Sequence, residues 1–470
     1  MKIGIEVVLL CLLALFAPAA SAAEVVPTAE AAPAAANEEP RVLVVALDGV
    51  PYRLLRQARE NGAFEGWPEA RPLVSTFPSM TNVAFTAMLT PLGAEPVRGY
   101  EIRHYDPDKN RVHGGGFASK KKTFAWKSLF DVISKGNYAK ARIYMTPRSM
   151  ARAELDKVAK AVLESPKEFM LAHVASTDML MHFVGDSAAL EAVEQAAESI
   201  DELRRQHLEI RGRPLRVILL SDHGNTFGKV EIVVGDLSEA LQKAGLRVSK
   251  KLKRPEDVLF AAYGIVGYAA LFSDPENAKI IATTLLEVEG VAFTAWSSGE
   301  DEISILAAEG LARIRWRSTP EGRELQYDRQ HGDPFGLLGT LTEMQAAGLV
   351  DDEGYASRED WFTHTASADY PDGLARLTDA LSGTWVSHPA TVMVGLQPGY
   401  ACGGRSVRVG AWFKGGHLEG THGGLDKDSS WGFFLDSDAD RVYPPVMRGD
   451  QALVEFAGRV ERDSADSDSP

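Results

Sequence analysis

Runs of consecutive large apolar residues are the strongest feature of this chain. Because such a run leaves no polar face for water, it predicts a strand buried on both sides, as in a parallel sheet. An amphipathic segment between the second and third runs predicts a helix that packs on this sheet. The alternation predicts an α/β fold with a mostly parallel central sheet flanked by helices. The strands are predicted over residues 41–47, 168–175 and 217–220, and the helix over residues 188–206.

The pattern changes beyond residue 247, where the apolar runs become shorter. We predict an inserted α+β cap over residues 248–387, which separates a first core part, residues 41–247, from a second, residues 388–461. Strands of the core are predicted to return over residues 390–396, 407–413 and 431–435. Within the cap, strands are predicted over residues 265–272, 291–297, 302–307 and 312–316, and helices over residues 276–287, 334–348 and 372–382.

The two ends of the chain differ from a folded domain. A basic residue, an apolar run over residues 7–16 and Ala-Ser-Ala at residues 20–22 predict a cleaved signal peptide over residues 1–22. The apolar run is too short to span a bilayer comfortably. Residues 23–40 predict a flexible linker and residues 462–470 a disordered tail. We therefore expect an exported protein, periplasmic or secreted, with no stable membrane insertion after cleavage.

Charge and cysteine content limit the possible partners. The formal net charge of the 470 residues is −15. Cleavage would remove one base, Lys2, and one acid, Glu6, and so leave this charge unchanged. Such a chain is not expected to bind nucleic acid polymers. Cys402 would be the only cysteine of the mature chain, so no intrachain disulfide is expected. No feature of the sequence indicates an oligomeric state.

Residues of the metal-ligand type follow each of the three predicted strands. Asp48 follows the first strand, and Asp222 and His223 follow the third. After the second strand, Asp178 and His182 are four residues apart, which places them on one face if the segment is helical. Any one of these acids could be a turn or capping residue. Because open α/β sheets hold ligands beyond the carboxyl ends of their strands, the joint placement predicts a metal site.

Two further histidines bear on this site. A glycine-rich loop over residues 415–424 carries His422, and glycine allows a backbone to approach a ligand closely. We therefore predict that His422 joins the metal ligands. His173 lies inside the second predicted strand and is interpreted as a packed core histidine rather than a ligand.

Thr81 precedes a segment with helical character, residues 83–89. The simplest interpretation is a helix N-cap. The same position would bring the hydroxyl close to free backbone N–H groups and to the positive end of the helix dipole, which binds phosphate and favours an alkoxide. Thr81 is thus also a candidate nucleophile. Three nearby residues either contact a substrate or have a purely structural or solvated role: Asn82, Arg103 and His104.

The order of these residues resembles the alkaline phosphatase superfamily, and in particular its type I phosphodiesterase/nucleotide pyrophosphatase branch. The resemblance implies two divalent metal ions, taken as zinc. One ion would be held by Asp48, Asp222 and His223 beside the nucleophile Thr81, and the other by Asp178, His182 and His422. The motifs that carry the resemblance are Leu47-Asp48-Gly49, Phe77-Pro78-Ser79-Met80-Thr81, Ser221-Asp222-His223-Gly224 and Gly420-Thr421-His422-Gly423.

The reaction implied by this resemblance is hydrolysis of phosphodiester or pyrophosphate bonds in a small-molecule substrate. It would proceed in two steps through a phosphothreonine at Thr81. The substrate contacts depart from the branch, because residues 82–85 replace its aromatic-Pro-Asn-His run and residues 101–104 lack its phosphoryl-binding Asn. Three alternatives therefore stay open: a phosphomonoesterase, a periplasmic phosphoryl-group transferase, and a non-catalytic metal-binding or scaffold protein.

Overall fold

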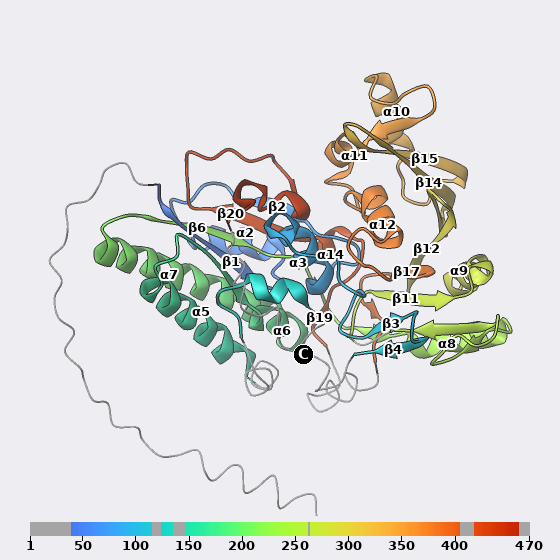
Figure 1. The fold of residues 1–470 in the computed structure, drawn as a ribbon, viewed down its shortest axis with the longest axis horizontal. Coiled ribbons are helices and arrows are strands. Elements are labelled where there is room, and N and C mark those ends of the chain that lie inside the picture. The colour runs from blue at the N-terminus through green and yellow to red at the C-terminus, as the bar shows by residue number, and fades with distance from the viewer. Residues whose placement is uncertain (1–38, 115–123, 135–145, 262–263, 405–417, 460–470) are drawn as a thin grey trace, which may run out of the picture. The chain divides into compact units, whose positions relative to one another are not determined.

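The apolar run Arg41–Leu47 forms strand β1 in a six-stranded sheet, which is seen in Figure 1, a view of the computed structural model. β1 pairs in parallel with β5 (Phe169–Val174) on one side and with β6 (Leu215–Leu220) on the other. Every residue of these three strands is buried, as expected for continuous apolar runs.

The rest of the sheet contains one reversed strand. β20 (Trp431–Asp436) is antiparallel both to β6 and to β2 (Arg71–Val74), and β2 is parallel to β21 (Met447–Arg448). β20 therefore runs against the other strands in the order β21-β2-β20-β6-β1-β5. The predicted mostly parallel central sheet is confirmed.

The structure describes residues 39–114, 124–134, 146–261, 264–404 and 418–459, all of which belong to the unit Glu39–Pro470. The predicted signal peptide, all but the last two residues of the predicted linker, the strand predicted over residues 407–413 and the predicted tail lie outside these residues. Among the described residues, no helix is long and apolar enough to cross a membrane.

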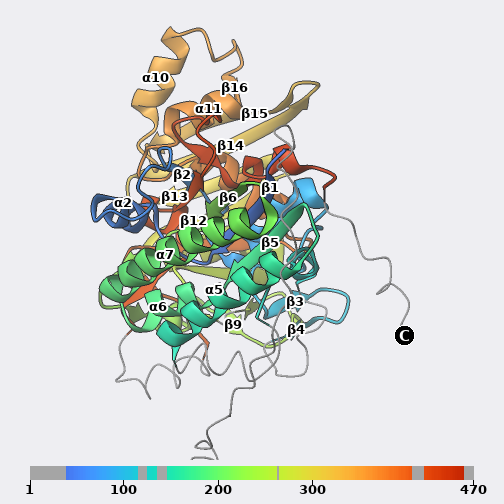
Figure 2. The same cartoon turned by 90° about the vertical axis from the view of Figure 1, so that its left-hand side faces the viewer.

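Helices cover both faces of the central sheet (Figures 1 and 2). Because side chains alternate along a strand, Leu43 and Val45 of β1 pack in one apolar cluster, and Val42 and Val44 pack in another. The first cluster contains residues of α2, α5 and α7, and the second contains residues of α3 and of the later part of the chain. The four helices are α2 (Tyr52–Glu60), α3 (Thr81–Leu89), α5 (Pro147–Glu164) and α7 (Asp186–Arg211).

A second, nine-stranded sheet follows, with the order β16-β15-β14-β13-β12-β17-β11-β10-β9. Its strands are β9 (Arg247–Val248), β10 (Asp257–Phe260), β11 (Tyr268–Ser273), β12 (Val291–Gly299), β13 (Glu302–Ala307), β14 (Gly310–Thr319), β15 (Gly322–Gly332), β16 (Tyr355–Ser357) and β17 (Val392–Leu396). The helices in this part are α8 (Val234–Lys243), α9 (Ala278–Leu286), α10 (Leu338–Ala346), α11 (Arg358–Thr365) and α12 (Gly373–Ser382).

Two details differ from the prediction. The strand predicted over residues 390–396 was expected in the core sheet, but β17 pairs with β11 and β12 of the second sheet. This prediction is wrong. Because β17 is buried on both faces, its apolar sequence fits either sheet and does not indicate which one it joins. Thr81 is the first residue of α3 rather than its N-cap, a position held by Met80.

Small elements complete the site end of the central sheet. The short antiparallel pair of β7 and β19 matters most, because it joins the chain after β6 to the late loop that carries His422. The short elements are β3 (His104–Asp106), β4 (Arg111–His113), α6 (Ser176–Phe183), β7 (Thr226–Phe227), β8 (Glu231–Ile232), β18 (Tyr400–Ala401), β19 (Gly420–Thr421) and α14 (Lys427–Ser430).

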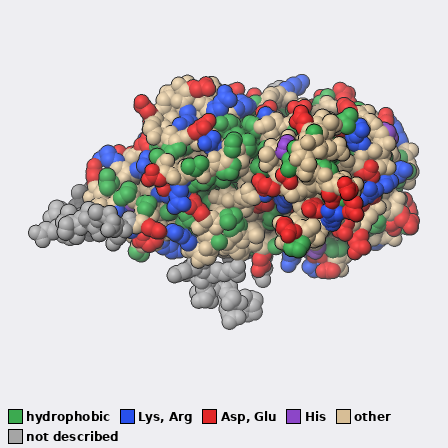
Figure 3. All heavy atoms as spheres, turned by 90° about the horizontal axis from the view of Figure 1, so that it is seen from above, with side chains coloured by type: hydrophobic (Ala, Val, Ile, Leu, Met, Phe, Trp, Pro, Cys, Tyr) green, Lys and Arg blue, Asp and Glu red, His purple; other side chains and the backbone are tan. Residues whose placement is uncertain are grey.

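Acidic and basic side chains are interspersed over the face of the molecule seen in Figure 3. Arg317 of β14 pairs with Glu324 of β15 at 2.7 Å, and it also pairs with Glu353 at 2.6 Å. Such exposed pairs contribute little stability individually.

Candidate active site

The carboxyl ends of β1 and β6 bring the first group of predicted ligands together. His223 Nε2 lies 3.6 Å from Asp48 Oδ1 and 3.4 Å from Asp222 Oδ2. The ligand atoms of these three buried residues all lie within 4.8 Å of one another. The arrangement follows from the parallel pairing of β1 and β6, which ends both strands at the same edge of the sheet.

The second predicted group gathers around Asp178. Its Oδ1 atom lies 3.5 Å from His182 Nε2 and 3.6 Å from His422 Nε2. α6 places Asp178 and His182 one turn apart, as their spacing predicts, and the β7–β19 pair brings His422 to them. The set of three ligand atoms within 4.8 Å here is Asp178, His223 and His422. His223 thus stands between the two groups, with its ring stacked on that of His422 at 4.0 Å.

All three histidines are held with Nε2 free to act as a ligand. In each ring Nδ1 faces a backbone carbonyl oxygen, which can only accept a hydrogen bond, so Nδ1 must carry the proton. The acceptors are Gly420 for His182 at 2.9 Å, Gly224 for His223 at 2.9 Å and Ser79 for His422 at 2.8 Å. A ring nitrogen fixed in this way orients the opposite nitrogen for metal binding.

Two carboxylate oxygens in the site lack a hydrogen-bond partner among the described residues. Asp178 Oδ1 and Asp222 Oδ2 are both buried. Burying a carboxylate oxygen without a partner is costly, and a bound cation would remove this cost. The nitrogen and oxygen donors around both atoms suit zinc. The residues therefore fit a pair of divalent metal ions.

The pKa values of the site residues without metal also indicate that a bound cation would stabilise the site. Burial, followed by repulsion from Asp222 and Asp178, raises the pKa of Asp48 well above its usual range. Burial also raises the pKa of Asp222 to about 7. Burial and the neighbouring His223 lower the pKa of His422 to about 3. His422 is thus neutral near pH 7, whereas the raised pKa values of Asp48 and Asp222 favour protonated carboxyl groups, whose protons a metal ion would displace.

Metal binding should therefore release more protons at pH 6 than at pH 8. With a pKa of about 7, Asp222 is mostly protonated at pH 6 and mostly ionised at pH 8, and His422 contributes nothing because it is neutral at both. Zinc calorimetry in buffers of different ionisation enthalpy measures the proton count. In the Asp222→Asn variant the difference between the two pH values should shrink. A wild-type count independent of pH would contradict the prediction.

Gly49 allows the two groups to approach. Its amide donates to Asp222 Oδ1 at 3.1 Å, and its φ of +72° is a left-handed value that favours glycine. A Cβ atom at this position would lie 2.8 Å from Asp178 Oδ1. Any larger residue would therefore push Asp178 away from the site.

Thr81, the candidate nucleophile, lies close to residues of the candidate metal site. Its Oγ1 donates to Asp48 Oδ1 at 3.2 Å and lies 3.3 Å from His223 Nε2. Because Thr81 begins α3, its hydroxyl is at the positive end of the helix dipole. The position suits a hydroxyl that must become an alkoxide.

His173 supports Asp48, a role that the sequence analysis missed. It is buried, with aromatic rings at 5.0 to 5.9 Å around it, as expected of a core histidine. Its Nε2 also lies 2.8 Å from Asp48 Oδ2. Burial lowers the pKa of His173 to about 3, so the ring is neutral near pH 7 and its Nε2 shares a hydrogen bond with the Asp48 carboxyl group. A polar residue inside an apolar strand, one position before its end, is the only signal for it in the sequence.

The three candidate substrate contacts are placed differently. The Asn82 amide is buried, where Nδ2 donates to Gly99 O at 2.9 Å and Oδ1 accepts from Trp126 Nε1 at 3.1 Å. Arg103 and His104 line a hollow together with Gly99. The other residues of this hollow are four aromatic residues, three alanines and one acid: Tyr100, Phe260, Tyr268, Phe272, Ala261, Ala269, Ala270 and Glu101. None of the seven clustered residues, Thr81 and the six ligands, is among its lining.

No protein-family model matches this chain, and no curated protein sequence matches it. Among solved structures, it is similar to murine ectonucleotide pyrophosphatase/phosphodiesterase 5, with 12% identity and a TM-score of 0.49 over 88% of this chain and 93% of that one. An inactive variant of the murine protein in complex with AMP matches at 11% identity and a TM-score of 0.49, over 90% and 95% of the two chains.

Phosphonoacetate hydrolase from Sinorhizobium meliloti 1021, in complex with phosphonoformate, matches at 13% identity and a TM-score of 0.46, over 90% of this chain and 96% of that one. The solved structures to which the chain is similar thus include the nucleotide pyrophosphatase/phosphodiesterase type that its motifs resemble.

Proposed function

We propose that this protein is an exported phosphoesterase that uses two divalent metal ions and Thr81 as its nucleophile. One observation carries the proposal: the Thr81 hydroxyl lies 3.2 Å from Asp48 and 3.3 Å from His223, in the middle of two groups of buried ligand-type residues. A hydroxyl held among acids and neutral imidazoles has little use in a structural site. It is well placed for attack on a phosphoryl group.

In this proposal each group of residues binds one metal ion. Asp48, Asp222 and His223 would hold one zinc ion, and Asp178, His182 and His422 the other. Bound zinc would lower the pKa of the Thr81 hydroxyl and neutralise the charge of the phosphoryl group. The order of the ligands along the chain, and the resemblance of their motifs, support this division.

The residues of the chain then account for two displacement steps. In the first, a bond forms between Thr81 Oγ1 and phosphorus, the bond to the leaving oxygen breaks, and the hydroxyl proton passes to Asp48 Oδ1, its hydrogen-bond partner at 3.2 Å. In the second, water attacks the phosphothreonine, the bond from phosphorus to Thr81 Oγ1 breaks, and the proton on Asp48 returns to Thr81 Oγ1. The proton that water gives up neutralises the leaving oxygen released in the first step. His173 keeps Asp48 turned toward Thr81 throughout.

We propose a phosphodiester or pyrophosphate as the substrate. The resemblance of the motifs supports this choice, and an aromatic hollow lies near the site. The hollow is tied to the site at two points: Asn82, which follows Thr81, donates to Gly99 of its lining, and Gly267, beside Tyr268, donates to His422 O at 2.7 Å. A phosphomonoester is the alternative if Arg103 meets the phosphoryl group.

A comparison of matched aryl phosphate esters tests this choice. For the zinc-loaded protein we expect a larger kcat/KM for the diester than for the monoester, and we expect Arg103→Ala to preserve that order. Arg111→Ala, on the exposed side of β4, is the control for a nearby loss of charge. A monoester preference that Arg103→Ala reverses would place Arg103 at the phosphoryl group and contradict the diester.

A further inference from the structure

A buried arginine from α12 joins the two loops that carry Thr81 and His422. Arg376 is only 4% exposed, and both terminal nitrogens of its guanidinium donate hydrogen bonds. Nη2 donates to Thr76 O at 2.9 Å and to Ser79 Oγ at 3.0 Å, and Nη1 donates to Leu425 O at 3.1 Å. A further bond, from Nη1 to Pro371 O at 2.9 Å, holds it at the start of its own helix.

Ser79 connects Arg376 to the site by further hydrogen bonds. Its hydroxyl donates to Gly424 O at 2.9 Å, and its carbonyl oxygen accepts the 2.8 Å bond from His422 Nδ1. Thr81 follows two residues later. One residue thus fixes the nucleophile loop and the ring of His422, and Arg376 is bonded to this residue.

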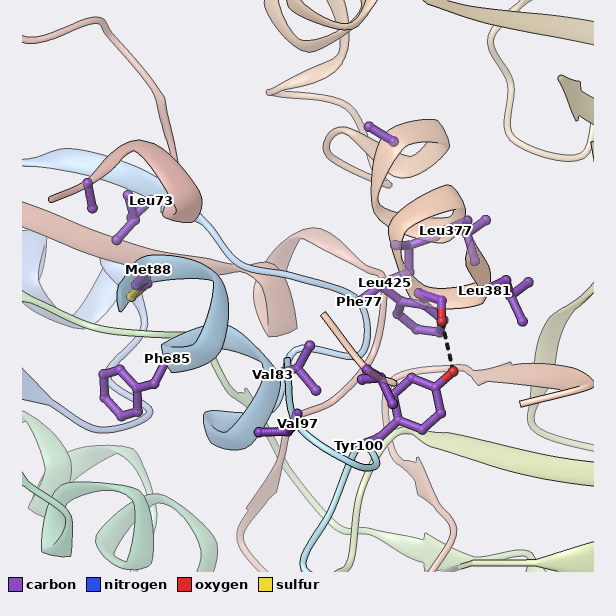
Figure 4. Packing of buried hydrophobic residues seen from close by; sticks show 14 of the residues in the cluster. Leu73, Phe77, Val83, Phe85, Met88, Val97, Tyr100, Leu377, Leu381 and Leu425 are labelled. Carbon is purple, nitrogen blue, oxygen red and sulfur yellow. Dashed lines mark hydrogen bonds between the residues drawn. The ribbon is translucent and has the colours of Figure 1, made fainter. Parts of the chain in front are cut away.

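α12 is itself firmly seated. Figure 4 shows Leu377 and Leu381 of the helix close to Phe77 and Leu425, in the same buried apolar cluster. The hydroxyl of Tyr100 donates to Ala380 O at 2.8 Å. Because the apolar face packs between the two loops, the helix presents Arg376 to both of them as a rigid support.

The charge of Arg376 is retained at some cost. Burial lowers its pKa to about 10, with Asp372 and Asp426 opposing this effect, so the guanidinium stays charged at pH 8. A buried cation is tolerated when most of its donors are satisfied, and hydrogen bonds from a charged group are stronger than neutral ones. The two terminal nitrogens of Arg376 donate four hydrogen bonds, whereas its buried Nε has no partner among the described residues. An apolar residue would fill the space without the cost, but it could not hold Thr76 and Ser79.

We propose that Arg376 is a positioning residue for the proposed phosphoesterase reaction. By holding Thr76 and Ser79, it sets the Thr81 hydroxyl and His422 Nε2 at their working separation. The inference rests on the proposed function for its catalytic consequence, and on the hydrogen bonds alone for its effect on the two loops. Arg376 does not touch the substrate.

The first arm of the test is kinetic. Arg376→Met and Ser79→Ala should each lower kcat by about ten- to a hundredfold with little change in KM, as for other residues that orient metal ligands. The double variant should lose little more than Arg376→Met alone, because the two residues act in series. Arg358→Met is the matched control. Arg358 also contacts α12, but it does so by pairing with the side chain of Asp379 at 2.8 Å, and it pairs with Asp450 at 3.4 Å. Its kcat should not change.

The second arm needs no turnover. Amide hydrogen exchange of residues 76–81 and 422–425 should be faster in Arg376→Met and in Arg376→Lys, which keeps the charge but not the fork of donors. Arg358→Met should leave it unchanged. If wild-type protein hydrolyses no phosphoester, the proposed function fails while this arm still tests Arg376. If the wild type is active, and kcat and exchange in the variants match it, the role of Arg376 is refuted while the function stands. Should Arg376→Met not fold, an unchanged kcat in Ser79→Ala overturns the inference equally.

Discussion

Replacing Thr81 by alanine should lower phosphoester turnover by about three orders of magnitude or more, a loss typical of removing a nucleophile. The fold and the metal sites should remain. Because Met80 rather than Thr81 is the N-cap of α3, no capping bond is lost. The stability change should therefore stay below the roughly 1 kcal/mol of a lost cap. Steady-state kinetics, thermal unfolding and metal analysis of the same preparation measure all three.

Thr86→Ala is a matched control, because Thr86 is a buried threonine on the same helix that donates to Asn82 O at 2.8 Å. It should keep its turnover. Thr81→Ser should retain a measurable part of it, since the serine hydroxyl can take the same position. If Thr81→Ala kept a near-normal kcat, Thr81 would not be the nucleophile, and Ser79 or Thr76 would be the next hydroxyl to consider.

Removing the metal ions should abolish activity and lower the melting temperature. Three acids, Asp48, Asp178 and Asp222, are buried together, and bound cations would offset the cost of ionising them. A ligand present at a thousand times its Kd adds about 4 kcal/mol to the free energy of unfolding. Chelation followed by thermal unfolding and kinetics, before and after zinc is restored, measures the effect. Restored zinc should recover both quantities.

Elemental analysis provides the control for this prediction. The wild type should hold two zinc ions per chain, and the double variant His182→Ala/His422→Ala should hold fewer. A protein that binds no transition metal after exposure to zinc, or that unfolds at the same temperature with and without a chelator, would contradict the two-metal site.

The sequence was sufficient for the sheet edge that carries the ligands. Continuous apolar runs identify β1, β5 and β6, and Asp48, Asp178 and Asp222 lie within four residues of the strand ends, so parallel pairing brings them to the same edge of the sheet. His422 could also be predicted from the sequence, because the glycines around it allow its loop to approach a ligand closely. Its approach to the site depends on the β7–β19 pair, whose two-residue strands leave no periodic pattern.

Other features depend on contacts that a local pattern does not record. The run that forms β17 suits either sheet, and its partners β11 and β12 are separated from it by about a hundred residues of chain. The strand β15 was not predicted because much of it is exposed and carries charged residues. Arg376 is the extreme case, since the backbone oxygen of Thr76 that it holds lies 300 residues away in the sequence.

The most direct test of the two-step reaction is to trap the phosphorylated protein. Zinc-loaded protein is mixed with an aryl phosphodiester, quenched in acid within the first turnover and digested for mass spectrometry. We predict a phosphorylated or monoester-modified peptide with the added mass on Thr81, which is absent from Thr81→Ala. An active protein that never carries this modification, or that carries it on another residue, would contradict the central claim.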